Sequence, residues 1–94
     1  MFSLSLMKII SWNVKGLNAS DKRQRIKQVI DSLQADIILF QETKMSQHNF
    51  DTIVTTWKKW KSHHMPGLGA FGGIAVLWNP LSINAQLIQQ ENNR

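Results

Sequence analysis

Two residues with side chains suited to chemistry follow two apolar stretches of the sequence. Asn13 comes directly after the stretch at residues 9–12, and Glu42 comes just after the stretch at residues 37–40. A carboxylate suits a hard divalent cation such as Mg²⁺, which takes one or two protein carboxylates and fills its other positions with water and phosphate oxygens. An amide can orient a phosphate or a carboxylate without adding charge. If the two stretches end side by side, the sequence predicts one small metal–phosphate site.

The first elements that must position these residues are a strand and a helix. Residues 7–12 predict a buried strand, and residues 13–19 predict the loop after it. Ser20 is expected as the N-cap of the helix, and the charge of Asp21 suits its first turn. The helix should end near residue 34. Its apolar residues recur at the i, i+3, i+4, i+7 spacing of one helix face, and they are Ile26, Val29, Ile30 and Leu33.

A second strand is predicted over residues 36–41, and its unbroken apolar run suits burial on both faces. The resulting strand–helix–strand unit is expected to be right-handed and parallel. The two strands then lie about 4.8 Å apart and end at the same edge of the sheet. Ligands of open α/β sheets bind at this edge. We therefore expect Asn13 and Glu42 to face one site. On spacing alone, the stronger interpretation is that both residues are ordinary loop residues without a functional role, because Asn and Glu are common in turns and loops.

The rest of the chain predicts shorter elements. In order they are a helix over residues 47–56 with Phe50, Ile53 and Val54 on one side, a strand over 59–65, a turn-rich connection over 66–73, a strand over 73–78 and a weaker strand over 82–88. Tryptophans are interleaved with basic residues in residues 57–64, and this segment could stack on and neutralise single-stranded nucleic acid. We instead expect the tryptophans to pack inward and the lysines to face water. The nearby glycines form no dinucleotide or P-loop fingerprint.

Size and charge limit the function classes. Ninety-four residues make at most one small domain. The net charge of +5 and the pI near 10.0 favour an anionic partner, and nucleic acid is preferred over a membrane surface. The sequence has no cysteine, which excludes disulfides and thiolate metal sites. No signal peptide or transmembrane segment is recognisable, which favours an intracellular location, the nucleus included.

Three blocks of this sequence resemble the opening of the endonuclease/exonuclease/phosphatase superfamily. They are ISWNVKGLN, ADIILFQETK and GGIAVLW, and the resemblance covers roughly residues 7–79. The superfamily includes apurinic/apyrimidinic endonucleases. The residues of these three blocks are most similar to those of the endonuclease domain of LINE-type non-LTR retrotransposons. The resemblance implies a DNase I-like α/β sandwich of two sheets. Residues 7–94 would supply its N-terminal βαβ portion, and residues 1–6 would be a dispensable leader.

The resemblance also implies roles for three residues. Glu42 matches the family's metal-binding glutamate in the QET block, and Asn13 matches the active-site asparagine of the WN block. Lys44 is placed either near substrate phosphates or in a solvated loop. The family uses a divalent metal, with Mg²⁺ expected, to cut phosphodiester or phosphomonoester bonds with an activated water. Among DNA, RNA, lipid and inositol phosphates, DNA is our first expectation for the substrate.

Two later blocks of the family, a GD-x-N-like block and a terminal SDH block, have no counterpart here. His63 and His64 do not replace them, because they come too early and because adjacent strand residues point to opposite faces. We therefore expect a fragment of a Mg²⁺-dependent endonuclease-like domain that is inactive by itself. The alternative is a non-enzymatic chain, either a truncated relic or a small basic nucleic-acid-binding module.

Overall fold

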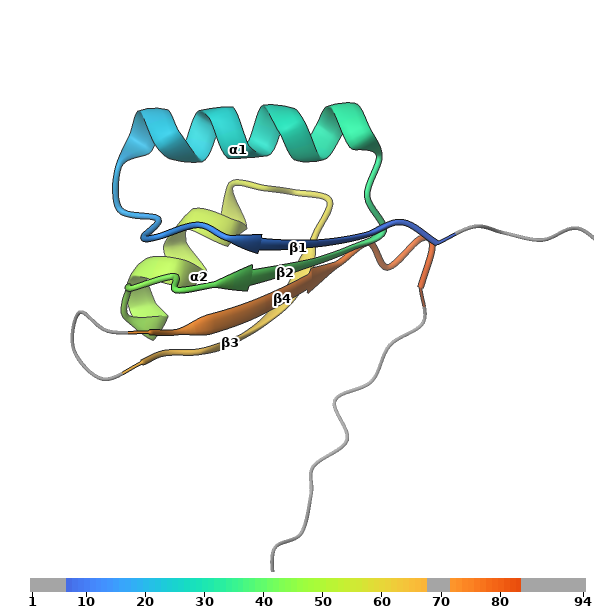
Figure 1. The fold of residues 1–94 in the computed structure, drawn as a ribbon. Helices are drawn as coiled ribbons and strands as arrows, with labels where there is room; N and C mark the ends of the chain where they lie inside the picture. The colour runs from blue at the N-terminus through green and yellow to red at the C-terminus, as the bar shows by residue number, and fades with distance from the viewer. Residues whose placement is uncertain (1–6, 68–71, 84–94) are drawn as a thin grey trace, which may run out of the picture.

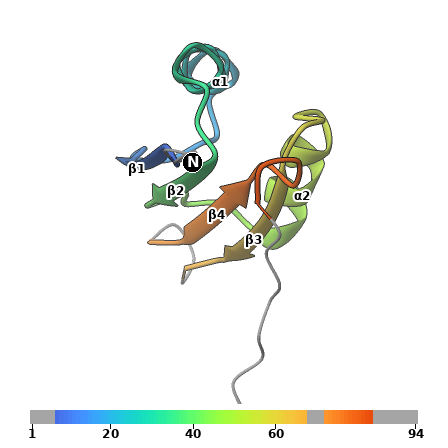
Figure 2. The same cartoon turned by 90° about the vertical axis from the view of Figure 1, so that its right-hand side faces the viewer.

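The computed structural model describes residues 7–67 and 72–83. In these residues, four strands form one mixed sheet, and two helices lie on the same side of it (Figures 1 and 2). The elements in chain order are β1 (Ile9–Asn13), α1 (Ser20–Leu33), β2 (Ile37–Gln41), α2 (Gln47–Thr55), β3 (Lys61–Met65) and β4 (Ile74–Trp78). The mixed α/β fold predicted from the sequence is confirmed. The leader proposed over residues 1–6 lies outside the described residues.

The sheet begins with the predicted parallel pair and continues with antiparallel strands. β1 pairs with β2 in parallel, with Asn13 opposite Gln41. β4 then lies between β2 and β3 and is antiparallel to both, so the strand order is β1-β2-β4-β3. Sequence periodicity predicts the strands but not this order, because the order depends on pairing between distant segments.

The core lies between the sheet and the two helices. Ile26 and Ile30 of α1 are buried, as are Phe50 and Val54 of α2. They face a row of buried sheet residues, which are Ile38, Phe40, Ala75 and Leu77. The other sheet face is open: Ile37 and Leu39 are only partly buried, so the prediction that β2 is buried on both faces is wrong for these residues.

Two local predictions about burial can be compared with the structure. Trp57 and Trp60 are buried while the intervening lysines are exposed, as expected. The predicted stripe of α1 is only half right, because Val29 and Leu33 are exposed. Val29 lies at the edge of the stripe farthest from Ile30, and Leu33 is the last residue of the helix.

The helix starts differ from each other. Ser20 is the first residue of α1 rather than its N-cap; Ala19 occupies the cap without a side-chain hydrogen bond. Its carbonyl accepts the Arg23 N–H at 3.1 Å, so the backbone enters the helix one residue early. Ser46 does cap α2, where its hydroxyl accepts the Asn49 N–H at 3.1 Å.

The end of the described chain is a turn. The N–H groups of Ser82 and Ile83 both donate to the carbonyl of Asn79 at 3.0 Å. The first two residues of the strand predicted over 82–88 are therefore in a turn, and residues 84–88 lie outside the described part. Within the described residues, none of the helices has the length and apolar character needed to cross a membrane.

Candidate active site

The carboxyl ends of β1 and β2 bring Asn13 and Glu42 into direct contact. The Asn13 side-chain Nδ2 donates a hydrogen bond to Glu42 Oε2 at 2.6 Å. The other amide atom, Oδ1, accepts the backbone N–H of Lys15 at 3.1 Å, which fixes the orientation of the amide. The expectation that the two side chains share one edge of the sheet is therefore met, whereas their chemical roles stay predictions.

The electrostatic surroundings favour the charged form of Glu42. The hydrogen bond from Asn13 is the largest effect and lowers the pKa of this carboxyl. Desolvation is the next largest effect and opposes it, and the positive charges of Lys44 and Lys15 add to the lowering. Glu42 is thus a carboxylate at neutral pH. An ionised, partly exposed carboxylate is the form that binds a hard cation.

The loop that presents Glu42 has an unusual backbone. Glu42 and Lys44 both have left-handed φ values, of 56° and 53°, and they flank Thr43. Such values cost roughly 1–2 kcal/mol per residue for side chains other than glycine. The left-handed backbone at Glu42 stops the regular strand at Gln41, so the Glu42 side chain leaves the alternation of β2.

Backbone hydrogen bonds hold this loop from both sides. On the β1 side, the Gly16 N–H donates to the Glu42 carbonyl at 2.7 Å and the Leu17 N–H donates to the Thr43 carbonyl at 3.1 Å. On the β4 side, the Thr43 N–H donates to the Gly73 carbonyl at 3.1 Å. These bonds continue the sheet pairing past the strand ends, which makes the edge that carries Glu42 a well-defined part of the fold.

Lys44 lies at the border of the site. Its Nζ is 3.7 Å from Glu42 Oε1, and the pair is partly exposed, so the direct attraction is weak. Lys44 also lines a surface hollow of about 290 Å³, which we call the lysine groove and which is lined by Lys15, Gly16, Asn18, Ala19, Lys22 and Lys44. The groove brings three lysines together, and two of them, Lys15 and Lys44, lie near Glu42. Sequence reasoning named Lys44 but missed Lys15 and Lys22 as its neighbours.

The donor atoms present suit only a lightly held metal ion. Among residues 7–67 and 72–83, no group of three or more His, Cys, Asp or Glu side chains gathers around a common point. Glu42 supplies one carboxylate, and the Asn13 amide is engaged in orienting it. This set fits a Mg²⁺ ion that is held by one carboxylate and completes its shell with water and phosphate oxygens; it does not fit a cage of protein ligands.

The side chains of the two adjacent histidines lie on opposite faces of β3, as predicted. His63 is exposed, whereas His64 is buried on the helix-covered face of the sheet. His64 Nε2 is 2.9 Å from the Thr43 hydroxyl, so a second polar contact reaches the loop of Glu42 from inside the protein. Sequence reasoning missed this pair. The available signal was the strand alternation, which turns His64 inward if Lys61 and His63 face water.

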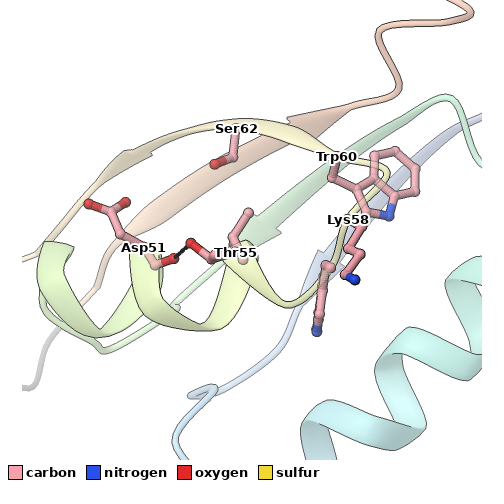
Figure 3. Close-up of a pocket in the computed structure, with 7 residues that line it drawn as sticks. Asp51, Thr55, Lys58, Trp60 and Ser62 are labelled. Carbon is pink, nitrogen blue, oxygen red and sulfur yellow. Dashed lines mark hydrogen bonds between the residues drawn. The ribbon is translucent and has the colours of Figure 1, made fainter.

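A separate hollow lies between α2 and β3 (Figure 3). It measures about 320 Å³, and its lining includes Asp51 and Thr55 of α2, Ser62 of β3, and Lys58 and Trp60 of the connection between them. The Thr55 hydroxyl is bound to the Asp51 carbonyl at 2.7 Å. The lining contains neither Asn13 nor Glu42, so this hollow is not part of the candidate site.

Comparison with known proteins gives matches over most of the chain. A family model described as the Endonuclease/Exonuclease/phosphatase family matches residues 10–84. The protein named DNA-(apurinic or apyrimidinic site) endonuclease 2 from Xenopus laevis is 49% identical over 45 residues, which are 48% of this chain and 8% of that protein.

Solved structures share the fold. The catalytic domain of Xenopus laevis APE2 superposes with a TM-score of 0.61 at 33% identity, covering 78% of this chain and 23% of that one. The 3′ phosphatase NExo from Neisseria, solved with a product DNA hairpin, gives a TM-score of 0.65 at 26% identity and covers 78% and 27%. The chain thus spans about a quarter of the length of these solved relatives.

Proposed function

The chain belongs to the endonuclease/exonuclease/phosphatase family, and from this premise we propose that it forms the part of a phosphodiesterase site that holds a divalent metal ion and a nucleic-acid phosphate. The observation that carries the proposal is the contact between Asn13 Nδ2 and Glu42 Oε2 at the shared end of β1 and β2. The matched family model includes both residues.

Each residue of the site has a distinct proposed role. Glu42 would hold the metal, and Asn13 would orient its carboxylate, since the amide is itself fixed by the Lys15 N–H. A bound Mg²⁺ would stabilise charge on the phosphate and activate water. Lys44 would partly neutralise Glu42 and face the incoming phosphate, because it lies at the border between Glu42 and the lysine groove.

DNA is the substrate that the relatives favour. One matched structure is described with a product DNA hairpin, and another relative is named as an endonuclease of apurinic or apyrimidinic sites. The lysine groove suits a phosphate backbone, because neutralising phosphates releases counterions and gives salt-sensitive affinity. We further propose that this chain derives from a LINE-type retrotransposon, because the residues of its WN and QET blocks resemble those of such endonuclease domains.

Hydrolysis by these 94 residues alone is not expected. A positioned base contributes about 10²–10⁴ to the rate, and one charge-stabilising donor contributes about 10²–10³. The GD-x-N and SDH blocks that would supply such groups are missing from the sequence. The second candidate function is therefore a non-catalytic nucleic-acid-binding module. It is favoured by the lysine groove and by the single carboxylate of the site.

A hybrid protein separates the two functions. Residues 10–83 would replace the matching segment of Xenopus laevis endonuclease 2, and cleavage of abasic DNA would be measured with Mg²⁺ and with EDTA. We expect Mg²⁺-dependent cleavage by the hybrid and at least a hundredfold loss in Glu42→Ala, on the scale of losing one charge-stabilising group. Asp31→Asn, which alters an exposed carboxylate on α1, is the matched control.

The chain alone forms the second arm of this experiment. It should bind DNA in low salt without nicking plasmid or abasic substrate. A folded hybrid that cleaves equally well with Glu42→Ala would refute the metal-binding role. Nicking by the chain alone that EDTA and Glu42→Ala both abolish would show a more complete site than proposed.

A further inference from the structure

We infer that His64 is a positioning residue: through the hydroxyl of Thr43 it fixes the loop that presents Glu42 and Lys44 to the substrate. This inference rests on the proposed function for its consequence, since it assumes that Glu42 holds the metal. The contact itself does not depend on that assumption. Thr43 Oγ1 and His64 Nε2 are 2.9 Å apart, and both side chains are buried.

Thr43 is the inner member of the loop. Its exposed fraction is 0%, whereas Glu42 and Lys44 on either side are partly exposed. Glu42 and Lys44 both have left-handed backbones. The direction of their side chains therefore depends on the two peptide units that connect them to Thr43. Fixing the Thr43 side chain therefore fixes both charged residues of the site. A buried hydroxyl that loses its hydrogen-bond partner is destabilising, so His64 supports this arrangement.

His64 is held firmly by other elements. Its ring stacks on Phe50 of α2, with centroids 4.3 Å apart and planes inclined by 23°. Its backbone pairs with Ala75 of β4. The contacts from Phe50 to His64 to Thr43 thus connect α2 and β3 to the loop after β2, through packed side chains in the core.

The second ring nitrogen argues against a purely packing role. His64 Nδ1 is buried, and no group in the described part of the chain forms a hydrogen bond with it. An apolar ring would stack on Phe50 without leaving a buried nitrogen unpaired, which is destabilising. Burial also lowers the pKa of His64, with Asp51 opposing and His63 reinforcing the shift, so the ring is neutral and can share one hydrogen bond with Thr43 in either tautomer.

Gly73 closes the loop from the other side. A Cβ atom at Gly73 would overlap the Thr43 hydroxyl, and the Gly73 carbonyl already accepts the Thr43 N–H at 3.1 Å. The hydroxyl is thus enclosed between Gly73 and the imidazole of His64. This enclosure leaves the Thr43 side chain little freedom to rotate. A change at His64 would therefore shift Thr43 and, through the backbone, Glu42.

Four variants test the inference on the full 94-residue chain. His64→Phe keeps an aromatic ring on Phe50 but removes the hydrogen bond, and Thr43→Val keeps the shape but removes the hydroxyl. His64→Gln and Thr43→Ser are the conservative partners, because each keeps a group able to make the bond. Hydrogen–deuterium exchange would be followed by mass spectrometry in a peptide over residues 41–46 and in one over residues 20–33.

The exchange result requires no metal and no activity. We expect His64→Phe and Thr43→Val to speed exchange over residues 41–46 about tenfold, the scale of one lost hydrogen bond, with little change over residues 20–33. The conservative variants should stay near the wild-type rate. Equal exchange over 41–46 in all variants would overturn the inference. Loss of protection over both peptides in Thr43→Val and Thr43→Ser alike would also overturn it, because it would show general packing.

Binding of Mn²⁺ separates this inference from the proposed function. We expect His64→Phe and Thr43→Val to weaken Mn²⁺ binding about 10-fold or more, as is typical when a group that orients a ligand is lost, and the conservative variants to restore it. If Glu42→Gln binds Mn²⁺ as tightly as wild type, the proposed function fails and the exchange result decides the inference. If Glu42→Gln alone weakens binding, the inference fails and the proposed function stands.

Discussion

At the scale of single residues, the site depends on an amide that orients a carboxylate. Asn13 uses both ends of its side chain, one toward Glu42 and one toward the Lys15 N–H. Spacing alone could not distinguish this from an ordinary loop, since Asn and Glu after strands are common. The blocks WN and QET allowed both residues to be predicted, and the structure adds the contact between them.

Removing the Asn13 amide should change the titration of Glu42. The hydrogen bond from Asn13 is the largest cause that lowers the pKa of Glu42, so Asn13→Ala should raise this pKa toward its ordinary value. The stability that Glu42 contributes is present above its unfolded pKa and is lost as the pH falls through the folded pKa. In Asn13→Ala this loss should begin at a higher pH.

The measurement is a ¹³C NMR titration of the Glu42 carboxyl carbon between about pH 2 and pH 7. Asn18→Ala is the matched control, because the Asn18 amide donates to the Lys44 carbonyl and not to Glu42. An unchanged pKa in Asn13→Ala would contradict the orienting role.

At the scale of elements, the left-handed residues 42 and 44 and the glycines of the neighbouring loops determine how the site is presented. The Glu42 loop is hydrogen-bonded to the loop after β1 on one side and to the start of β4 on the other. β4 therefore supports the site although it contributes none of the predicted site residues. Its close approach is possible because residue 73 is a glycine with φ of 97°.

A methyl group at Gly73 should disturb this support. Gly73→Ala would combine a left-handed backbone with overlap against the Thr43 hydroxyl, and we expect a loss of about 2–4 kcal/mol in the free energy of unfolding, from strain plus overpacking. Gly16→Ala has the same φ of 97°, but its Cβ would make only an ordinary contact, with Lys44 Cδ at 3.8 Å, so it should lose only about 1–2 kcal/mol. Urea denaturation would measure both, and equal losses would contradict the predicted overlap.

Local patterns predicted the elements better than their arrangement. The apolar runs predicted β2 and β4, and the helical spacing of Phe50, Ile53 and Val54 predicted α2. The insertion of β4 between β2 and β3 depends on long-range pairing, which a local pattern does not contain. The bond between Thr43 and His64 could not be predicted for the same reason, since 21 residues separate its partners.

At the scale of the whole molecule, one face of the sheet is covered and the other is open. Both helices lie on the same side, as Figure 2 shows. The opposite face carries exposed apolar side chains, among them Ile9 with 63%, Met65 with 55% and Ile74 with 45% of the surface exposed. The partly buried residues of the same face are Ile37, Leu39, Val76 and Trp78.

The open face should make the 94-residue chain self-associate. Exposed apolar sheet faces and free strand edges favour association, and β1 and β3 are the edge strands of the described sheet. Sedimentation velocity should show concentration-dependent oligomers, and the double variant Ile9→Lys with Ile74→Lys should reduce them. The control is the double variant Gln24→Lys with Gln28→Lys, which adds the same charge at exposed positions of α1. A wild-type monomer at all concentrations, with sharp reversible unfolding, would contradict the prediction.

Binding of Mn²⁺ to the 94-residue chain shows directly whether Glu42 anchors a divalent metal at the joint end of β1 and β2. Loss of a group that merely orients a ligand typically costs about 10–100-fold in affinity. We therefore predict a saturable site, measured by electron paramagnetic resonance of free Mn²⁺, that Glu42→Gln weakens at least a hundredfold and that Asp31→Asn leaves intact. Equal affinity in Glu42→Gln and the wild-type chain would show that Glu42 does not anchor the metal.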